Sequence, residues 1–244
     1  MWPFRPRPAL IRPEPGPAPS RSYGKWAGSV QMLALAAIVA GWVAMPARAQ
    51  PAAGHPVKIV ALGDSLTAGY GLPADAAFPV RLERALTGKG LAVDVINAGV
   101  SGDTSADGLA RLDWSVPDDT DAAIVELGAN DALRGIDPQL TRAALDAILT
   151  RLAARRLPVL LAGMRAPPNM GAEYAKTFNT IYPDLAAAHG VLLYPFFLDG
   201  VAAEPRLNQG DGVHPTAAGV DVIVARLLPK AEELVTRARA ARTP

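Results

Sequence analysis

The chain has 244 residues, 50% of them hydrophobic and 19% charged, so it is long enough to bury one sizeable core, and its length favours a single domain. The formal net charge of +1 is uneven, because residues 1–49 contribute +5 and the remainder about −4. The sequence contains no basic stripe that would neutralise phosphates, so a nucleic-acid partner is not expected. The lack of cysteine excludes disulfides, thiol catalysis and cysteine-ligated metals.

The start of the chain predicts export. A Pro- and Arg-rich stretch, Met1–Arg21, precedes an apolar core, Met32–Met45, and Ala47-Arg48-Ala49 then forms the small-residue pattern of a signal-peptide cleavage site. We predict a signal peptide over residues 1–49 with a long basic, Pro-rich n-region, cleaved between Ala49 and Gln50. The protein is then expected to be periplasmic or secreted, with no stable membrane span after cleavage. The alternative is an uncleaved N-terminal membrane anchor, because the uncharged stretch from Trp26 is nearly long enough to span a bilayer.

A small-residue linker, residues 50–56, leads into one predicted domain, residues 57–244, in which short apolar runs alternate with longer helical patterns. In chain order the predicted elements are strand Val57–Leu62, helix Phe78–Thr87, strand Ala92–Asn97, helix Thr104–Leu112, strand Ala122–Leu127, helix Pro138–Arg155, strand Pro158–Met164, helix Ala172–His189, strand Val191–Tyr194 and a last helix from about Pro215 to Arg239. Near-continuous apolar runs are typical of strands covered on both faces. Their alternation with helices implies right-handed crossovers. The sequence therefore predicts an α/β fold, a three-layer α/β/α sandwich with a five-stranded parallel sheet.

Polar clusters follow the first three predicted strands. They are Gly63-Asp64-Ser65-Leu66, Asn97 to Asp103, and Gly128-Ala129-Asn130-Asp131. In open α/β sheets, ligands bind beyond the carboxyl ends of the strands. All three clusters are therefore expected on the same rim of the sheet, where they predict a functional site.

Of the three histidines, His214 has the setting that catalysis requires. Asp211 lies three residues before it and can reach the ring within one turn to hold its Nδ1–H. A histidine oriented in this way serves as a general base that becomes an imidazolium. The alternative is that Asp211 caps the final helix and leaves His214 exposed.

Serine is scarce after residue 49, and Ser65 is the serine that follows the first strand directly, so its hydroxyl is expected at the rim. An ordinary strand-end turn with Ser65 as a cap is the alternative. Acyl transfer also needs donors for an oxyanion. The N–H of Gly102, the side-chain amide of Asn130 and the N–H of Ser65 are the candidates, although Gly102 could serve only a turn and Asn130 could be a helix cap.

Together these residues resemble the SGNH (GDSL-type) hydrolases, and most closely the branch of exported bacterial arylesterases and multifunctional thioesterase/lysophospholipases. Four blocks, in family order, carry the resemblance: Gly63-Asp64-Ser65-Leu66-Thr67-Ala68-Gly69-Tyr70-Gly71, Val100-Ser101-Gly102-Asp103-Thr104-Ser105, Glu126-Leu127-Gly128-Ala129-Asn130-Asp131 and Asp211-Gly212-Val213-His214-Pro215. They span most of the chain after the predicted cleavage site.

The resemblance implies Ser65 as nucleophile, His214 as base and Asp211 as its orienting carboxylate, with the Ser65 N–H, Gly102 and Asn130 as oxyanion donors. It also implies a flavodoxin-like sheet, no cofactor, no metal, and small acyl or aryl esters as substrates, with acyl-thioesters or lysophospholipids as further candidates. Ala129 stands where close relatives often have a second glycine, so its methyl group is expected to tighten the loop. The stretch Arg165–Tyr174 and the loop Pro195–Gln209 are expected to shape the substrate pocket.

Three other interpretations stay open from the sequence. The first is a carbohydrate O-acetyl esterase, because related domains deacetylate glycans. The second is a metal-dependent hydrolase that uses Asp64, Asp211 and His214 as ligands, although no further histidine or cysteine is at hand. The third is a non-catalytic exported module that binds a ligand at the rim. The oligomeric state does not follow from the sequence.

Overall fold

The computed structural model describes residues 55–242, and the predicted signal peptide, its cleavage site and residues 50–54 of the linker lie outside them. Within residues 55–242, the five strands are β1 (Val57–Gly63), β2 (Val93–Gly99), β3 (Ala122–Glu126), β4 (Val159–Ala162) and β5 (Leu192–Tyr194). They form one sheet in the order β2-β1-β3-β4-β5, and every pair of neighbours is parallel. This is the strand order of flavodoxin-like sheets, so the predicted fold class is confirmed.

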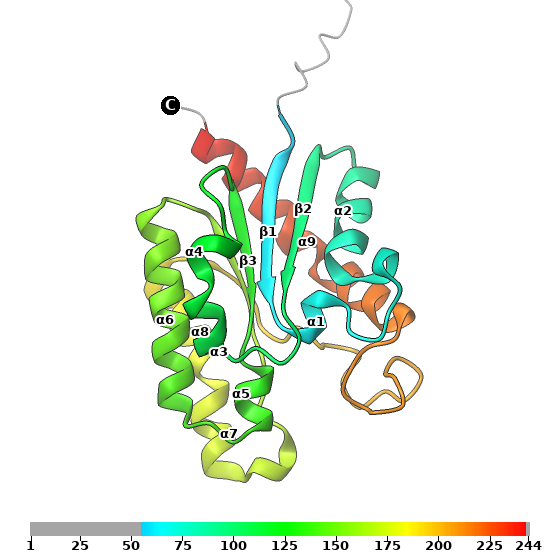
Figure 1. Cartoon of the computed structure of the whole chain (residues 1–244), viewed down its shortest axis with the longest axis vertical. Helices are drawn as coiled ribbons and strands as arrows, with labels where there is room; N and C mark the ends of the chain where they lie inside the picture. Colours follow the sequence, from blue (N-terminus) through cyan, green and yellow to red (C-terminus); the bar gives the residue numbers. More distant parts are fainter. Residues whose placement is uncertain (1–54, 243–244) are drawn as a thin grey trace, which may run out of the picture. The chain divides into compact units, whose positions relative to one another are not determined.

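The sheet order follows from two directions of winding. The chain runs from β1 outward to β2, then crosses back over β1 to β3 and continues to β4 and β5. The described helices are α1 (Ser65–Ala68), α2 (Phe78–Gly88), α3 (Ser105–Ala110), α4 (Leu112–Ser115), α5 (Ala129–Leu133), α6 (Pro138–Ala154), α7 (Ala172–Asn179), α8 (Ile181–His189) and α9 (Ala217–Arg242), with 3-10 turns at Ala74–Ala76 and Pro168–Met170. Right-handed crossovers place helices on opposite faces when the winding direction reverses. Helices α2 and α9 pack together on one face, and α6 packs with α3 and α8 on the other (Figure 1).

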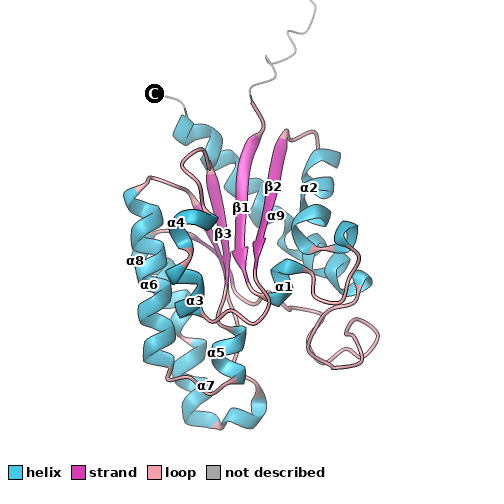
Figure 2. Ribbon diagram, viewed as in Figure 1, coloured by secondary structure: helices cyan, strands magenta, loops and turns pink. Residues whose placement is uncertain are grey.

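The three central strands of this sheet, β1, β3 and β4, are buried on both sides. Every residue of β3 and β4 is buried, and β1 is buried except for Lys58, which is partly exposed. Because β-branched and other apolar side chains fill both faces, the core is continuous from α2 and α9 through the sheet to α6 and α8. Figure 2 shows the helices on both sides of the strands. No helix within residues 55–242 is long and apolar enough to cross a bilayer.

The carboxyl ends of the first three strands meet at the same edge of the sheet. Gly63, the last residue of β1, lies opposite Gly99 at the end of β2 and opposite Glu126 at the end of β3. The reversal of winding lies between β1 and β3, and this is the place where α/β sheets form ligand crevices. The three polar clusters therefore emerge together.

The prediction of one helix over Ala172–His189 is wrong. The structure has two helices there, α7 and α8, which meet at Thr180. Pro183 is the cause, because it has no N–H to offer to the carbonyl of Asn179, and its ring would clash with that carbonyl in an unbroken helix. The final helix also starts later than predicted, at Ala217, because Pro215 forms an isolated antiparallel bridge with Asn208.

Candidate active site

The turn that follows β1 presents Ser65 at the edge of the sheet. Asp64 is the N-cap of α1, and its Oδ1 accepts the N–H of Leu66 at 2.9 Å. Ser65 is the first residue of this single helical turn, so its N–H has no acceptor within the helix. The turn ends at Gly69 in the left-handed conformation. A short helix of this kind points both the hydroxyl and the N–H of Ser65 at the same rim.

The structure brings Ser65, His214 and Asp211 into one chain of hydrogen bonds, although 149 residues separate Ser65 from His214. The Ser65 Oγ lies 2.9 Å from the Nε2 of His214, and the Nδ1 of His214 lies 2.7 Å from the Oδ2 of Asp211. With the Nδ1 proton directed at the carboxylate, Nε2 is left to accept the serine proton.

Asp211 is held as a carboxylate by the loop that carries it. Its Oδ1 accepts the N–H groups of His214 at 3.0 Å and of Val213 at 2.9 Å. These two bonds and the bond to the His214 ring lower the pKa of Asp211 to about 2. The first turn of α9 is capped instead by Thr216, whose hydroxyl accepts the Gly219 N–H at 3.2 Å. The alternative in which Asp211 caps the final helix is therefore not what the structure shows.

A residue that the sequence did not point to covers the histidine. The ring of Tyr70 lies against the His214 ring with centroids 4.6 Å apart, and it remains 54% exposed. The Nε2 of Gln209 donates to the backbone carbonyl of Tyr70 at 2.7 Å and so ties the turn after α1 to the loop that carries His214. In the sequence Tyr70 is only one residue of the motif Gly63 to Gly71, because its contact with His214 joins segments that lie far apart in the chain.

Two further candidate donors lie beside the serine. Gly102 follows β2 with φ +89°, a conformation that favours glycine, and its carbonyl accepts the Nη2 of Arg134 at 2.7 Å. Asn130 lies inside the first turn of α5 and is not its cap, which is Gly128. The Nδ2 of Asn130 donates to the carbonyl of Asp103 at 3.0 Å and to the Oδ2 of Asp64 at 3.2 Å.

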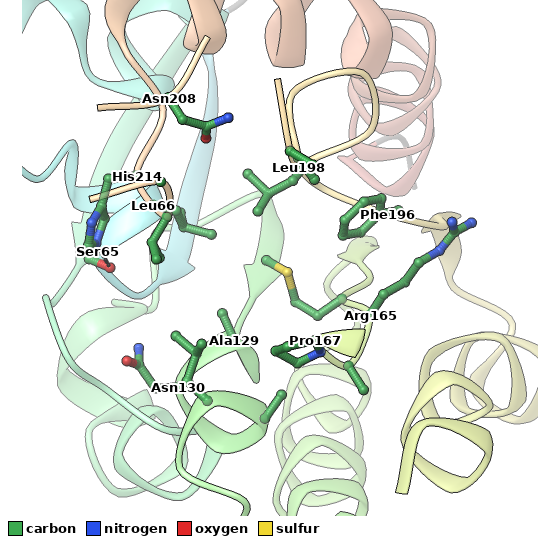
Figure 3. A pocket seen from close by; sticks show the side chains of 18 of the residues that line it. Ser65, Leu66, Ala129, Asn130, Arg165, Pro167, Phe196, Leu198, Asn208 and His214 are labelled. Carbon is green, nitrogen blue, oxygen red and sulfur yellow. Dashed lines mark hydrogen bonds between the residues drawn. The ribbon is translucent and has the colours of Figure 1, made fainter. Parts of the chain in front are cut away.

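An apolar cavity of about 450 Å³ opens next to these groups. Figure 3 shows Ser65, His214 and Asn130 at one end of it and Phe196 with Arg165 at the other. The guanidinium of Arg165 lies 5.0 Å from the centroid of the Phe196 ring. The apolar part of the wall includes Leu66, Ala129, Ala132, Leu133, Met164, Pro167, Leu198 and Val213.

The segments expected to shape the pocket contribute in part. Arg165 to Pro168 line the cavity from one of them, and Phe196, Leu198 and Asn208 line it from the other. Tyr174, at the end of the first segment, contacts a different place, because its hydroxyl donates to the carbonyl of Ile136 at 2.8 Å.

The proposed metal ligands do not form a ligand set. Among residues 55–242 there is no group of three or more histidine, aspartate or glutamate side chains that would hold a metal ion. Both oxygens of Asp64 accept N–H groups, and Asp211 is engaged by its own loop. The arrangement of donors around Ser65 suits acyl transfer instead.

The sequence also matches a known protein family. Residues 61–222 fit the model of the GDSL-like lipase/acylhydrolase family. The chain belongs to this family. The prediction that it is one of the SGNH (GDSL-type) hydrolases, which are carboxylic ester hydrolases, is thereby confirmed.

Members of this family with assigned activities are similar over most of their length. The arylesterase of Vibrio mimicus is 42% identical over 159 residues, which cover 65% of this chain and 80% of the relative. Esterase TesA of Pseudomonas aeruginosa is 35% identical over 201 residues, 82% of this chain and 99% of the relative. The crystal structure of AlinE4, an SGNH-hydrolase family esterase, has a TM-score of 0.63 at 49% identity and covers 74% of this chain and 97% of its own.

Proposed function

We propose that this protein hydrolyses carboxylic esters through a covalent acyl-enzyme on Ser65, with His214 as the base and Asp211 as the group that orients it. The observation that carries the proposal is the unbroken hydrogen-bond chain from the Ser65 Oγ through His214 to Asp211. It ends at a serine that lines an open apolar cavity. No part of this reaction calls for a metal or a cofactor.

The first half-reaction forms the acyl-enzyme. His214 Nε2 takes the Ser65 proton as Oγ attacks the ester carbonyl, and the carbonyl oxygen becomes an oxyanion. Collapse of the tetrahedral intermediate breaks the bond to the alcohol, which leaves with the proton from His214. In the second half-reaction, His214 removes a proton from water, which attacks the acyl-enzyme and releases the acid and Ser65.

Three donors are proposed to stabilise the oxyanion: the N–H of Ser65, the N–H of Gly102 and the side-chain amide of Asn130. They come from the ends of β1, β2 and β3, so the sheet holds them in place before the reaction begins. Asp211 stabilises the imidazolium that forms in both steps, because its low pKa keeps it charged throughout the working range of pH.

Acyl and aryl esters are the proposed substrates, with acyl-thioesters and lysophospholipids as further candidates. The wall of the cavity is formed largely by Leu, Ala, Met, Pro, Val and Phe side chains, which favour an apolar acyl chain or ring over a sugar. Named relatives include an arylesterase and a thioesterase 1/protease 1/lysophospholipase L1 of Escherichia coli, which is 43% identical over 158 residues. A carbohydrate O-acetyl esterase is the second candidate, and the apolar wall disfavours it.

Steady-state hydrolysis by wild type and Ser65→Ala, over a panel of p-nitrophenyl acyl esters, acyl-thioesters, lysophospholipids and acetylated sugars, tests this function. Ser65→Ala should lower kcat by several orders of magnitude on every substrate that is cleaved, because it removes the covalent nucleophile. The change opens no large cavity, so folding should be intact. Near-wild-type turnover by a folded Ser65→Ala protein would exclude the mechanism, and an absence of turnover on the whole panel would favour a binding module.

We further propose that the protein acts outside the cytoplasm, on the basis of the leader pattern over residues 1–49. N-terminal sequencing of the protein from its native host should give Gln50 as the first residue in the periplasmic or extracellular fraction. Recovery of Met1 on protein in the cytosol would contradict export, and recovery of Met1 in the membrane fraction would support the anchor.

A further inference from the structure

Two buried carboxylates, Asp64 and Glu126, lie at the end of the sheet that carries Ser65, and within residues 55–242 neither forms a salt bridge with a lysine or an arginine. Asp64 and Glu126 are both fully buried, at the ends of the adjacent strands β1 and β3. The charge of Asp64 raises the pKa of Glu126, so the two carboxyls lie close enough to interact. Two neighbouring negative charges that are buried away from water would destabilise the folded protein. The two groups are therefore expected to share one charge and one proton.

The hydrogen bonds at Asp64 fit a carboxylate. Its Oδ1 accepts the N–H of Leu66 at 2.9 Å, and its Oδ2 accepts the Nδ2 of Asn130 at 3.2 Å. Both partners are donors that cannot accept, so a proton on Oδ2 would face the amide group of Asn130 and displace it. The two accepted hydrogen bonds therefore favour the ionised form of Asp64.

The hydrogen bonds at Glu126 fit a protonated acid. Its Oε2 is 2.6 Å from the hydroxyl of Thr67, and the N–H groups of Asp64 and Thr67 act on the carboxyl and favour its charge. Its Oε1 is nevertheless buried and, within residues 55–242, makes no hydrogen bond of ordinary geometry. A buried carboxylate oxygen without a donor is costly, whereas the carbonyl oxygen of a neutral acid loses less. Thr67 can also accept from a protonated Oε2, because a hydroxyl both donates and accepts.

The charged groups around the pair agree with this assignment. His214, from the loop before α9, favours a charge on Asp64, and Asp131 of α5 opposes it. The guanidinium of Arg111 donates its hydrogen bonds elsewhere, to the carbonyls of Gly63 and Ala98 and to the carboxylate of Asp103.

The pKa values are both raised, and they give the same order of ionisation, in which Asp64 loses its proton before Glu126. Burial raises the pKa of Asp64 to about 7, although the hydrogen bond from Leu66, the charge of His214 and the hydrogen bond from Asn130 lower it. Burial and the charge of Asp64 raise the pKa of Glu126 well above its usual range, against the hydroxyl of Thr67 and the N–H groups of Asp64 and Thr67.

We propose that Asp64 and Glu126 carry a single negative charge that lies on Asp64, and that Asp64 is a positioning residue that holds the Asn130 amide in place for the oxyanion, while Glu126 holds the proton. This proposal rests on the proposed role of Asn130. Asp64 and the Asp103 carbonyl together fix the plane of the amide. Of the two hydrogen bonds that Asn130 donates, the one to Asp64 is the longer. The Asn130 N–H that points at Asp64 is therefore the one that an oxyanion on the substrate can share.

Asp64→Ser tests the positioning role. Serine is a good N-cap and keeps an oxygen for the Leu66 N–H, but it has no second oxygen for Asn130. We expect kcat to fall roughly tenfold to a hundredfold with little change in KM, as for the loss of a hydrogen bond to a charged group. In an Asn130→Ala background, the same substitution should lower kcat by less than about twofold, because Asp64 acts through Asn130.

Glu126→Gln tests where the proton lies. An amide replaces a neutral acid of the same shape, so we expect kcat to fall by no more than about threefold. A group whose pKa is raised by folding binds a proton on folding, so its contribution to the free energy of unfolding falls as pH rises above its unfolded pKa. Glu126→Gln should therefore take up about one proton fewer on folding between pH 5 and 7, seen as a flatter pH dependence of stability. The exposed Glu204→Gln should keep the wild-type slope.

Each outcome decides one part of the proposal. Wild-type kcat in the Asp64→Ser protein would overturn the positioning role. So would a double variant, Asp64→Ser with Asn130→Ala, whose fold-loss in kcat equals the product of the two single fold-losses. A wild-type pH slope for Glu126→Gln, or a loss of kcat equal to that of Asp64→Ser, would overturn the proton assignment. If Asp64→Ser does not fold, infrared difference spectra of wild type and Glu126→Gln still show whether a protonated carboxyl band disappears. Should Asn130→Ala keep full kcat, the oxyanion assignment fails first, and the spectra and pH slope report on the pair alone.

Discussion

Replacement of Gly128 by alanine would test how the loop after β3 holds Asn130. A Cβ at this position would lie 2.1 Å from the hydroxyl oxygen of Tyr182, and the backbone φ of +110° disfavours any L side chain. The strained backbone costs about 1–3 kcal/mol. To make room, the Tyr182 hydroxyl must leave the carbonyl of Leu127, to which it donates at 2.9 Å in the core.

The magnitude follows from these two effects. A buried carbonyl left without its donor costs about 1–3 kcal/mol, so the free energy of unfolding should fall by about 2–6 kcal/mol in total. Asn130 is two residues further along, and a shift of its amide by about 1 Å is enough to lower kcat by up to about a hundredfold. Stability and activity should therefore fall together.

Urea denaturation and p-nitrophenyl ester hydrolysis of Gly128→Ala, Tyr182→Phe and the double variant are the assay. Tyr182→Phe removes the atom that clashes, and the next ring atom, Cζ, is at an ordinary 3.4 Å. The fall in the free energy of unfolding of the double variant should thus be smaller, by at least about 1 kcal/mol, than the sum of the falls in the two single variants. Strictly additive losses would show that the Tyr182 hydroxyl is not what makes alanine intolerable at this position.

Three further substitutions have separate readouts. Asn130→Ala should lower kcat about 10²–10³-fold, or about 2.7–4 kcal/mol, with little change in KM, and a rise in KM alone would make it a ground-state binding residue. Phe196→Ala should lengthen the cavity and favour longer acyl chains in kcat/KM by up to about 0.8 kcal/mol per added methylene, with acetyl esters as the control. An unchanged chain-length profile would place the acyl chain elsewhere. Arg111→Met should lower stability in urea by about 3–5 kcal/mol, because it leaves the largely buried Asp103 carboxylate, 2.5 Å from the guanidinium, without its partner. A loss under about 1 kcal/mol would show that water reaches Asp103.

The fold was predictable because its strands carry a strong and simple signal. Runs such as Val57–Leu62 and Ala122–Leu127 are apolar on both faces, which occurs in parallel sheets covered by helices. Their ends differ from the observed strands by a residue or two, as boundaries usually do. The break at Thr180 was also within reach of the sequence, because Pro183 stands where an unbroken helix needs an N–H.

The sequence predicted those residues of the candidate site whose position is set by the carboxyl edge of the sheet. Ser65, Gly102 and Asn130 each follow a strand, and parallel strands bring such residues to one edge. Tyr70 was not predictable as a cover for His214, because that contact joins two loops whose conformation no local pattern specifies. The sequence shows Glu126 only as part of a motif, because a glutamate usually predicts exposure, and the packing of the described residues shows that it is fully buried.

Mass spectrometry of the protein after reaction with a p-nitrophenyl alkylphosphonate tests the central claim most directly. A phosphonate forms a stable adduct with an activated serine, because its phosphorus takes the place of the ester carbonyl carbon that the serine attacks. We expect one adduct per chain, on the peptide that contains Ser65, at a rate that falls steeply in His214→Ala. An adduct on another serine, or no adduct on a protein that still cleaves esters, would contradict the covalent mechanism.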